Sequence, residues 1–412
     1  LNSKIKQAKV SIDNFTSPTL NFKGKVDIQL ADIKNFVKQS SLHEKAGEYI
    51  DNIELSGKGE LDLEFFLPLH GDYRTQVGGE LKFDGGKLAL SRENYELTKL
   101  HGSVRFAGER VESSALNAHL GGKLMDIDIE TTPHQNGLSY DIGLTGNLPI
   151  QSLLAPAPSV KGFFNGDTNW DILLNVRPQN DTKKTDIKIT AASDLLGVSS
   201  LLPGRLGKLP AQAMPLKLNI NIESGTGVKY DLELNKTTHI NVTDEAGQFL
   251  FSVDDESIRG EASYKPSASS GAALEIALEY LDLNKFLNTG EPPVEEEEND
   301  DEVVQSAAVN EKTVLTGAFA GQSALSPGGA PEGGAGVSPR DIPSLRFSTK
   351  SLIWKKFKFN HATLKTRQTN LGMVVEKLDL VSSDYTVSAT GNWLAGWNNK
   401  NTTKLEADIV IG

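Results

Sequence analysis

Apolar and polar residues alternate with a period of two along most of this chain. Val26, Ile28 and Leu30, for example, alternate with Asp27 and Gln29. Successive side chains of a strand point to opposite faces, so each such run predicts a strand with one apolar and one polar face. Gly, Asn or Asp commonly separates the runs, which favours short turns. The pattern predicts a mainly all-β protein, built as an elongated antiparallel meander rather than from parallel βαβ units.

One glycine pair lies between two apolar runs. Leu81 and Phe83 precede Gly85-Gly86, and Leu88 and Leu90 follow it. Two alternating runs joined by a short glycine segment are typical of a β-hairpin. We therefore expect a hairpin turn at Gly85-Gly86.

Helical patterns are few and short. We expect short helices near residues 32–50, 149–154 and 282–287, each directly after a strand. The segments 30–37 and 280–287 resemble each other, and 148–154 is a looser copy. We interpret them as boundaries between sheet modules. The alternative is that so short a pattern recurs by chance.

Residues 288–340 differ in composition from the rest. They contain ten acidic residues against Lys312 and Arg340, out of a net charge of −12 for the whole chain. Such a segment buries too little apolar surface to offset chain entropy, so we expect a disordered insertion. A role in binding calcium or a cationic partner is the alternative. Residues 1–287 and 341–412 are then two lengths of one sheet. The sequence has no stripe of basic residues that would bind phosphates, so we expect no nucleic-acid partner.

Sequence signatures of catalysis are missing. We find no GxSxG, GxxxxGK[ST] or HExxH pattern, no cysteine, and no close pair among the seven histidines. The carboxylates of 254–256 follow a strand and are interpreted as a charged turn. We expect no enzyme activity, no metal and no cofactor. No apolar run reaches the ~18 residues of a membrane-spanning helix, and we expect any export signal or anchor to lie outside this chain.

A sheet with one apolar face must cover that face. It can pack against a second sheet, or curl into an open apolar trough that holds an apolar ligand. For the trough we predict these lining residues: Ile53, Leu63, Leu81, Phe83, Leu88, Val104, Phe106, Ile127, Ile172, Leu174, Leu218, Ile220, Leu232, Leu234, Phe251 and Ile276. Their polar neighbours should face water: Glu54, Asp62, Lys82, Arg105, Asp171, Asn221 and Glu233.

The segment 193–218 combines many leucines with proline and glycine. Proline at this density excludes a central strand and a long helix, so the apolar side chains need another cover. One interpretation is a plug over the end of the sheet core. The other is a lip or gate that contacts apolar ligand through Leu195, Leu196, Leu202 and Leu206.

This segment also carries a family resemblance. Residues 193–198, followed by Leu202-Pro203, Leu206, Lys208 and Pro215-Leu216, resemble the strand–loop–strand segment of YhdP proteins in the AsmA-like superfamily. Residues 160–172 look like the strand before it, and 378–405 are similar to later sheet repeats. The strand patterns alone would also suit TamB-like proteins, but the loop makes YhdP the better match. The resemblance spans about 20–412, apart from the acidic insertion.

The resemblance has consequences for function. It implies a periplasmic protein of a Gram-negative bacterium, anchored in the inner membrane through a segment outside this chain. It implies a long sheet folded into a trough that moves phospholipids toward the outer membrane and supports its permeability barrier. Phospholipid acyl chains and membranes would then be its partners, and no catalytic motif is carried over.

Two other function classes remain open. One is a structural or adhesive β-repeat protein of the envelope. The other is a glycan-binding protein that stacks sugars on its four tryptophans: Trp170, Trp354, Trp393 and Trp397. The alternation around Trp170 places that residue on the apolar face, whereas Trp393 and Trp397 have the appearance of a loop feature.

Overall fold

The computed structural model describes most of the chain. The described residues are 3–13, 18–38, 52–70, 76–91, 94–134, 137–155, 161–179, 184–202, 204–223, 227–245, 247–266, 274–287, 313–315, 339–340, 343–395 and 401–412. They form two compact units, of which unit 1 comprises Leu1–Leu202 and Leu206–Lys236. Unit 2 comprises Pro203–Arg205 and Thr237–Gly412. The division at Lys236 falls inside the range 1–287 that the sequence analysis treats as one segment.

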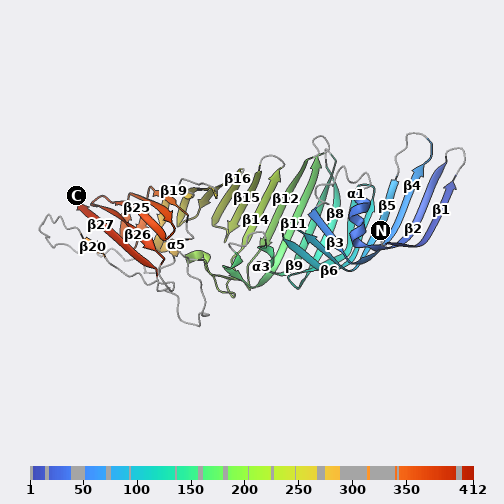
Figure 1. Cartoon of the computed structure of the whole chain (residues 1–412), viewed down its shortest axis with the longest axis horizontal. Coiled ribbons are helices and arrows are strands. Elements are labelled where there is room, and N and C mark those ends of the chain that lie inside the picture. Colours follow the sequence, from blue (N-terminus) through green and yellow to red (C-terminus); the bar gives the residue numbers. More distant parts are fainter. Residues whose placement is uncertain are drawn as a thin grey trace. The chain divides into compact units, whose positions relative to one another are not determined.

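Unit 1 is a row of strands (Figure 1). Its strands are β1 (Lys4–Asp13), β2 (Thr19–Gln29), β3 (Ile53–Ser56), β4 (Lys58–Pro68), β5 (Gln76–Leu90), β6 (Tyr95–Ala107), β7 (Arg110–Leu120), β8 (Lys123–His134), β9 (Gly137–Pro149), β10 (Phe164–Asn165), β11 (Asp167–Gln179), β12 (Lys184–Ser193), β13 (Ser199–Ser200), β14 (Leu216–Glu223) and β15 (Gly227–Leu234). Its helices are α1 (Leu30–Lys38) and α3 (Ile150–Leu153), and η1 (Gly204–Leu206) is a 3₁₀ turn where the chain passes between the units.

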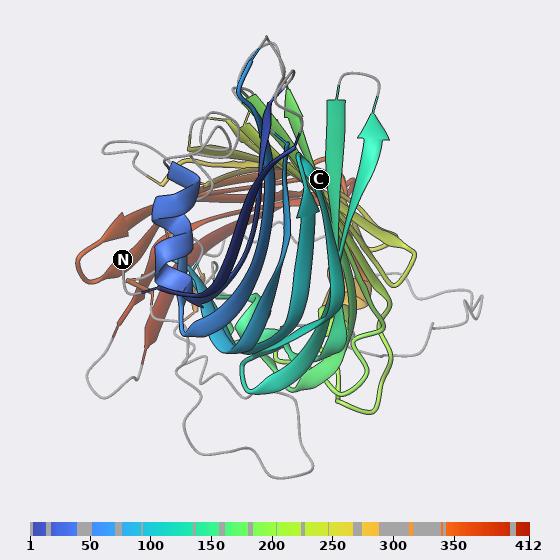
Figure 2. The same ribbon diagram turned by 90° about the vertical axis from the view of Figure 1, so that its right-hand side faces the viewer.

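The main sheet of unit 1 is an antiparallel meander. Its strands pair in the order β1-β2-β4-β5-β6-β7-β8-β9-β11-β12-β14-β15, and β3 pairs with β5. Only β10 and β13 form a separate small sheet. Among the described strands β1 has β2 as its sole partner, so the sheet is open at that edge. The strands bend along their length (Figure 2). The predicted fold class is confirmed.

Unit 2 is also mainly β. Its strands are β16 (Thr238–Glu245), β17 (Gln248–Asp254), β18 (Ile258–Tyr264), β19 (Leu274–Asp282), β20 (Thr313–Leu315), β21 (Leu345–Thr349), β22 (Leu352–Trp354), β23 (Phe357–Phe359), β24 (His361–Thr369), β25 (Gly372–Val381), β26 (Tyr385–Leu394) and β27 (Thr402–Ile411), and its helix is α5 (Leu283–Leu287). The pairing order is β16-β17-β18-β19-β21-β24-β25-β26-β27, while β22 and β23 form a hairpin.

One junction in unit 2 departs from the antiparallel pattern. β19 pairs in parallel with both β21 and β22. Parallel neighbours need a crossover of a dozen or more residues, and the chain between β19 and β21 contains α5 and the acidic segment 288–340. Within that segment only 313–315 is described in a strand; β20 pairs there with β27. The expected disorder of 288–340 otherwise lies outside the described residues.

The expected hairpin at Gly85-Gly86 is wrong. β5 continues without a turn from Gln76 to Leu90, and its register with β6 shifts around Gly86. Gly85 has φ +77°, and a Cβ on Gly86 would lie 2.6 Å from Cδ1 of Leu30. The two glycines therefore form a β-bulge that bends the strand and lets the first residue of α1 pack against it.

The short helices each begin directly after a strand. α1 follows β2, α3 follows β9, and α5 follows β19. Leu30 of α1 is fully buried and Ile150 of α3 is 6% exposed, while Leu283 of α5 packs against the core of unit 2. These positions match the three expected helical sites. The further helical turn expected up to residue 50 lies outside the described residues.

Candidate functional site

The apolar side chains of unit 1 form rows that cross the sheet. Residues that are directly opposite in register share one face of an antiparallel sheet. The row that we call the Ile172 row contains Leu116, Ile127, Leu144, Ile172, Ala191, Leu218 and Leu232. The next, the Ile220 row, contains Ile129, Ile142, Leu174, Ile189, Ile220 and Tyr230. The third, the Ile222 row, contains Thr131, Tyr140, Val176, Ile187, Ile222 and Val228.

Burial decreases from the first row to the other two. Ile172 and Ala191 are 8% and 6% exposed and belong to the largest buried cluster of unit 1. Every member of the Ile220 and Ile222 rows is only half-buried. In the Ile220 row, Leu174, Ile189 and Ile129 still pack against buried clusters, whereas Ile220 does not. No member of the Ile222 row packs against a buried cluster. The apolar face therefore continues from the core through the Ile220 row, which borders it, to the Ile222 row, and the side chains of both rows are partly exposed.

The segment 193–218 closes the opposite end of this face. Leu195 and Val198 are 4% and 0% exposed, and with Trp170 they belong to the same buried cluster. Leu206 and Met214 pack against that cluster from the side. These buried residues place the segment as a plug over the ends of the strands.

A buried lysine holds this plug together. Lys208 is 7% exposed, and its Nζ donates hydrogen bonds to the carbonyl oxygens of Leu195, at 2.8 Å, and Val198. Burial lowers the pKa of Lys208, although the charge of Asp194 opposes the shift. The sequence analysis quoted Lys208 for its resemblance and missed its structural role. Its place between two prolines in a leucine-rich loop was the available signal.

The residues predicted for a lip or gate separate into different environments. Leu195 is in the core, and Leu206 is half-buried and packs against it. Leu202 is half-buried, and Leu196 is 49% exposed. Leu196 is thus the most exposed of the four, and Leu195 the most buried.

The predicted lining residues lie on apolar faces in both units. Ile172 and Leu234 are buried, and the following are half-buried: Ile53, Leu63, Leu81, Phe83, Leu88, Val104, Phe106, Ile127, Leu174, Leu218, Ile220, Leu232, Phe251 and Ile276. Phe83 packs against two buried clusters, one around Leu61 and one around Leu100, so it is closer to a core residue than Ile220 is.

The opposite face of unit 1 is charged. Lys82 and Lys25 both lie 3.2 Å from carboxylate oxygens of Asp62, and Arg105 lies 3.4 Å from Glu80. Burial opposes ionisation of Asp62, but the two lysines outweigh it and lower its pKa. A hydrogen bond from Ser103 is the main cause of the lowered pKa of Glu80.

The predicted polar neighbours agree with this division. Glu54, Arg105 and Asp171 are exposed. The other four, Asp62, Lys82, Asn221 and Glu233, are half-buried. Water and ion pairs thus occupy one face of the sheet, and apolar side chains the other.

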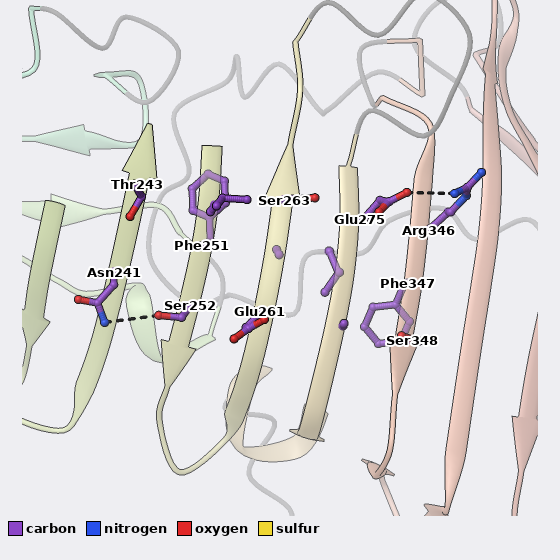
Figure 3. A pocket seen from close by; sticks show the side chains of 14 residues that line it. Asn241, Thr243, Phe251, Ser252, Glu261, Ser263, Glu275, Arg346, Phe347 and Ser348 are labelled. Carbon is purple, nitrogen blue, oxygen red and sulfur yellow. Dashed lines mark hydrogen bonds and ion pairs between the residues drawn. The ribbon is translucent and has the colours of Figure 1, made fainter. Parts of the chain in front are cut away.

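In unit 2 a corresponding apolar row crosses five strands: Phe251, Ala262, Ile276, Phe347 and Leu364. A pocket of about 560 Å³ lies over β16–β19 and β21 (Figure 3). Its lining includes the first four of these residues, but most of the lining residues, such as Asn241 and Glu261, belong by alternation to the other face of the strands. Arg346 and Glu275 form an ion pair of 3.0 Å at its border. Phe251 and Ile276 belong to the same row, while the pocket itself is lined by residues of both faces.

The tryptophans do not form one platform. Trp170 is 8% exposed in the core of unit 1, so it is not available for stacking on a sugar. Trp393 lies within β26, opposite Met373 and Thr403, and not in the expected loop. Its neighbours continue the strand alternation, which the sequence analysis overlooked at this position. Trp397 lies outside the described residues.

The described part of the chain has neither a candidate metal cluster nor a candidate membrane-spanning helix. No three His, Asp or Glu side chains gather there in a way that could hold a metal ion. No described helix has both the length and the apolarity needed to cross a membrane.

The two units define a mainly β protein whose open antiparallel sheet has an apolar and a charged face. A family model described as YhdP protein matches residues 1–314. The chain belongs to the YhdP family, a family of AsmA-like proteins of the bacterial envelope, and the resemblance is confirmed. The match ends at 314, so the similar residues at 378–405 lie beyond it. No curated protein and no solved structure matches the chain.

Proposed function

We propose that this chain is a segment of a lipid conduit, in which the apolar face of the sheet shelters phospholipid acyl chains. The observation that carries the proposal is the pair of half-buried apolar rows, of which the Ile220 row borders the core and the Ile222 row lies beyond it. Apolar surface left in water is costly, and each methylene that a ligand buries there gains ~0.8 kcal/mol. A ligand that is long, apolar and without fixed polar groups fits this surface.

The dimensions of the rows suit an acyl chain. The Ile220 row crosses β8, β9, β11, β12, β14 and β15. Strands lie ~4.8 Å apart, so this row spans roughly 25 Å, against ~15 Å for the hydrocarbon of one leaflet. One acyl chain therefore fits along the row. No polar side chain interrupts it except at Tyr230, which favours passage of lipids over selection of one headgroup.

The location and direction are part of the same proposal and rest on the family. We place the chain in the periplasm, tethered to the inner membrane in the full-length protein. There it passes phospholipids toward the outer membrane and supports the permeability barrier. Catalysis has no part in this function, because a conduit needs only a continuous apolar surface.

The test is site-specific photocrosslinking in living cells. A photoreactive residue at Ile220 should give adducts with phospholipid, because that side chain faces the proposed ligand. The matched control is Asn221, the next residue of β14, whose side chain points to the other face. Adducts at Ile220 without adducts at Asn221 support the conduit. No lipid adduct at Ile220, or equal labelling at both positions, means that the face is structural.

A further inference from the structure

The hairpin of β22 and β23 in unit 2 has an unusual tip. Trp354 and Phe357 are paired across the hairpin, and Lys355 and Lys356 form the turn between them. Trp354 is 46% and Phe357 39% exposed. Lys358 follows on the second strand and is also exposed. Two exposed aromatic rings and three cations thus lie within five consecutive residues.

The apolar side of the hairpin continues the core of unit 2. Leu352 and Phe359 are paired two residues further from the tip, and they are 7% and 4% exposed. Trp354 and Phe357 lie two residues along the same strands, so they are on the same face. The ring of Phe357 meets Tyr385 edge-on, with centroids 6.3 Å apart. The core therefore extends outward along the hairpin until its aromatic rings reach solvent.

The lysines of the tip have no carboxylate partner among the described residues. The Nζ of Lys355 lies 6.0 Å from the centre of the Trp354 ring, and that of Lys356 lies 5.9 Å from Phe357. By contrast, the nearby Lys350 pairs with Glu279. An anionic partner would complement the charge that the described residues leave unbalanced at the tip.

The tip is held in a defined position. The backbone N–H of Lys355 donates to Oδ1 of Asn284 at 2.7 Å, and Nδ2 of Asn284 donates to the carbonyl of Lys355 at 2.9 Å. Asn284 belongs to α5, which is fixed at its start by Asp282, a buried acceptor for the N–H groups of Asn284 and Lys285. Such anchoring presents the rings and the lysines together and reduces the ordering required on binding.

We propose that the β22–β23 hairpin docks on the surface of a bilayer that contains anionic phospholipid. Aromatic rings are favoured at the level of the headgroups, and lysines bind anionic headgroups through long stems that reach outward. The tip offers both on an exposed two-residue turn, which fits a flat and fluid surface better than the pocket of a protein. Charge complementarity selects the anionic bilayer. This inference does not depend on the conduit, because it concerns binding to a bilayer and not the transfer of lipid.

The first test uses the absence of cysteine from the chain. Lys356→Cys in the whole chain takes an environment-sensitive fluorophore at the tip, and Lys229→Cys on β15 is the matched exposed control. Vesicles of phosphatidylcholine with about one third phosphatidylglycerol should shift the emission to the blue at position 356 only. Pure phosphatidylcholine should give a much smaller shift, and ~1 M salt, with a Debye length of ~3 Å, should weaken the response.

The second test removes the charge. Lys355→Asn, Lys356→Gln and Lys358→Gln together should lower partitioning to the anionic vesicles roughly a hundredfold, at about fivefold for each lysine. Asn at 355 tolerates the φ of +53° found there. The control is Lys58→Gln, Lys229→Gln and Lys265→Gln, which removes the same charge from exposed positions away from the tip. Equal loss in both triple variants, unchanged binding by the tip variant, or a response to polyglutamate but not to vesicles would overturn the proposal.

Discussion

The ammonium group of Lys208 is bonded at 2.8 Å to the carbonyl oxygen of Leu195, inside the plug that covers the end of the unit 1 core. Both residues are buried, and Leu195 packs in the cluster that contains Trp170. The lysine thus satisfies backbone carbonyls in a loop too rich in proline to pair them in a strand. Closure of the apolar face at this end depends on that bond.

Replacing Lys208 by Met should therefore destabilise the protein. The substitution keeps the apolar stem but leaves buried carbonyls unsatisfied, at an expected cost of ~1–3 kcal/mol. Thermal or urea unfolding measures the change. Lys217→Met is the control, because that side chain on β14 is 65% exposed. If both variants unfold at the wild-type midpoint, the bond does not stabilise the plug.

Two isoleucines on one apolar face should respond differently to a charge. Ile172→Asp places a carboxylate in the core, where Ile172 is 8% exposed, and should cost several kcal/mol. Ile220→Asp places it in the half-buried row, where water can reach the charge, so the loss should be clearly smaller. Urea denaturation of both variants gives the comparison. Equal destabilisation would show that Ile220 is as enclosed as Ile172.

Acid should weaken unit 2 through Asp255. This carboxylate is 6% exposed and accepts hydrogen bonds from Thr238 at 2.7 Å and from the N–H of Ser257 at 2.8 Å. Burial opposes its ionisation, but the hydrogen bonds and Arg205 outweigh burial and lower its pKa below 3.8. A lowered folded pKa stabilises the protein above the ordinary value, and this contribution is lost as pH falls through the folded pKa.

The expected result is a stability that falls when the pH is lowered below about 4, with a shallower fall in Asp255→Asn over the same range. Melting temperatures measured across this range for both proteins provide the test. The variant should also be less stable near neutral pH, because an amide accepts fewer hydrogen bonds than a carboxylate. Parallel pH curves for the two proteins would contradict the assignment to Asp255.

Gly86 should not tolerate a side chain. The Cβ of alanine would lie 2.6 Å from Leu30 Cδ1, and Leu30 is fully buried at the start of α1. We expect Gly86→Ala to lower stability by ~1–3 kcal/mol through this overpacking. Gly162→Ala is the matched control, because nothing lies within 4 Å of its added Cβ. A wild-type melting temperature for Gly86→Ala would mean that α1 is free to move away.

The sequence by itself determined the strands and their two faces. Alternation in a run such as Leu216–Glu223 depends only on neighbouring residues, because strand geometry sends successive side chains to opposite sides. The short helices after β2, β9 and β19 could also be predicted from neighbouring residues, because each has apolar residues at helical spacing within its own segment. For the same reason the residues of the predicted apolar surface could be named before any contact was known.

Tertiary structure decided what closes the face and where it stays open. Gly85-Gly86 has the local sequence of a turn, yet it forms a bulge because α1 packs against it. The parallel pairing of β19 with β21 depends on a long intervening segment. Ile172 and Ile220 have the same kind of alternating neighbours, but only Ile172 lies near the plug that Lys208 holds in place. Whether an apolar residue is buried depends on packing against residues that are distant in sequence. The alternation pattern does not show which distant residues these are.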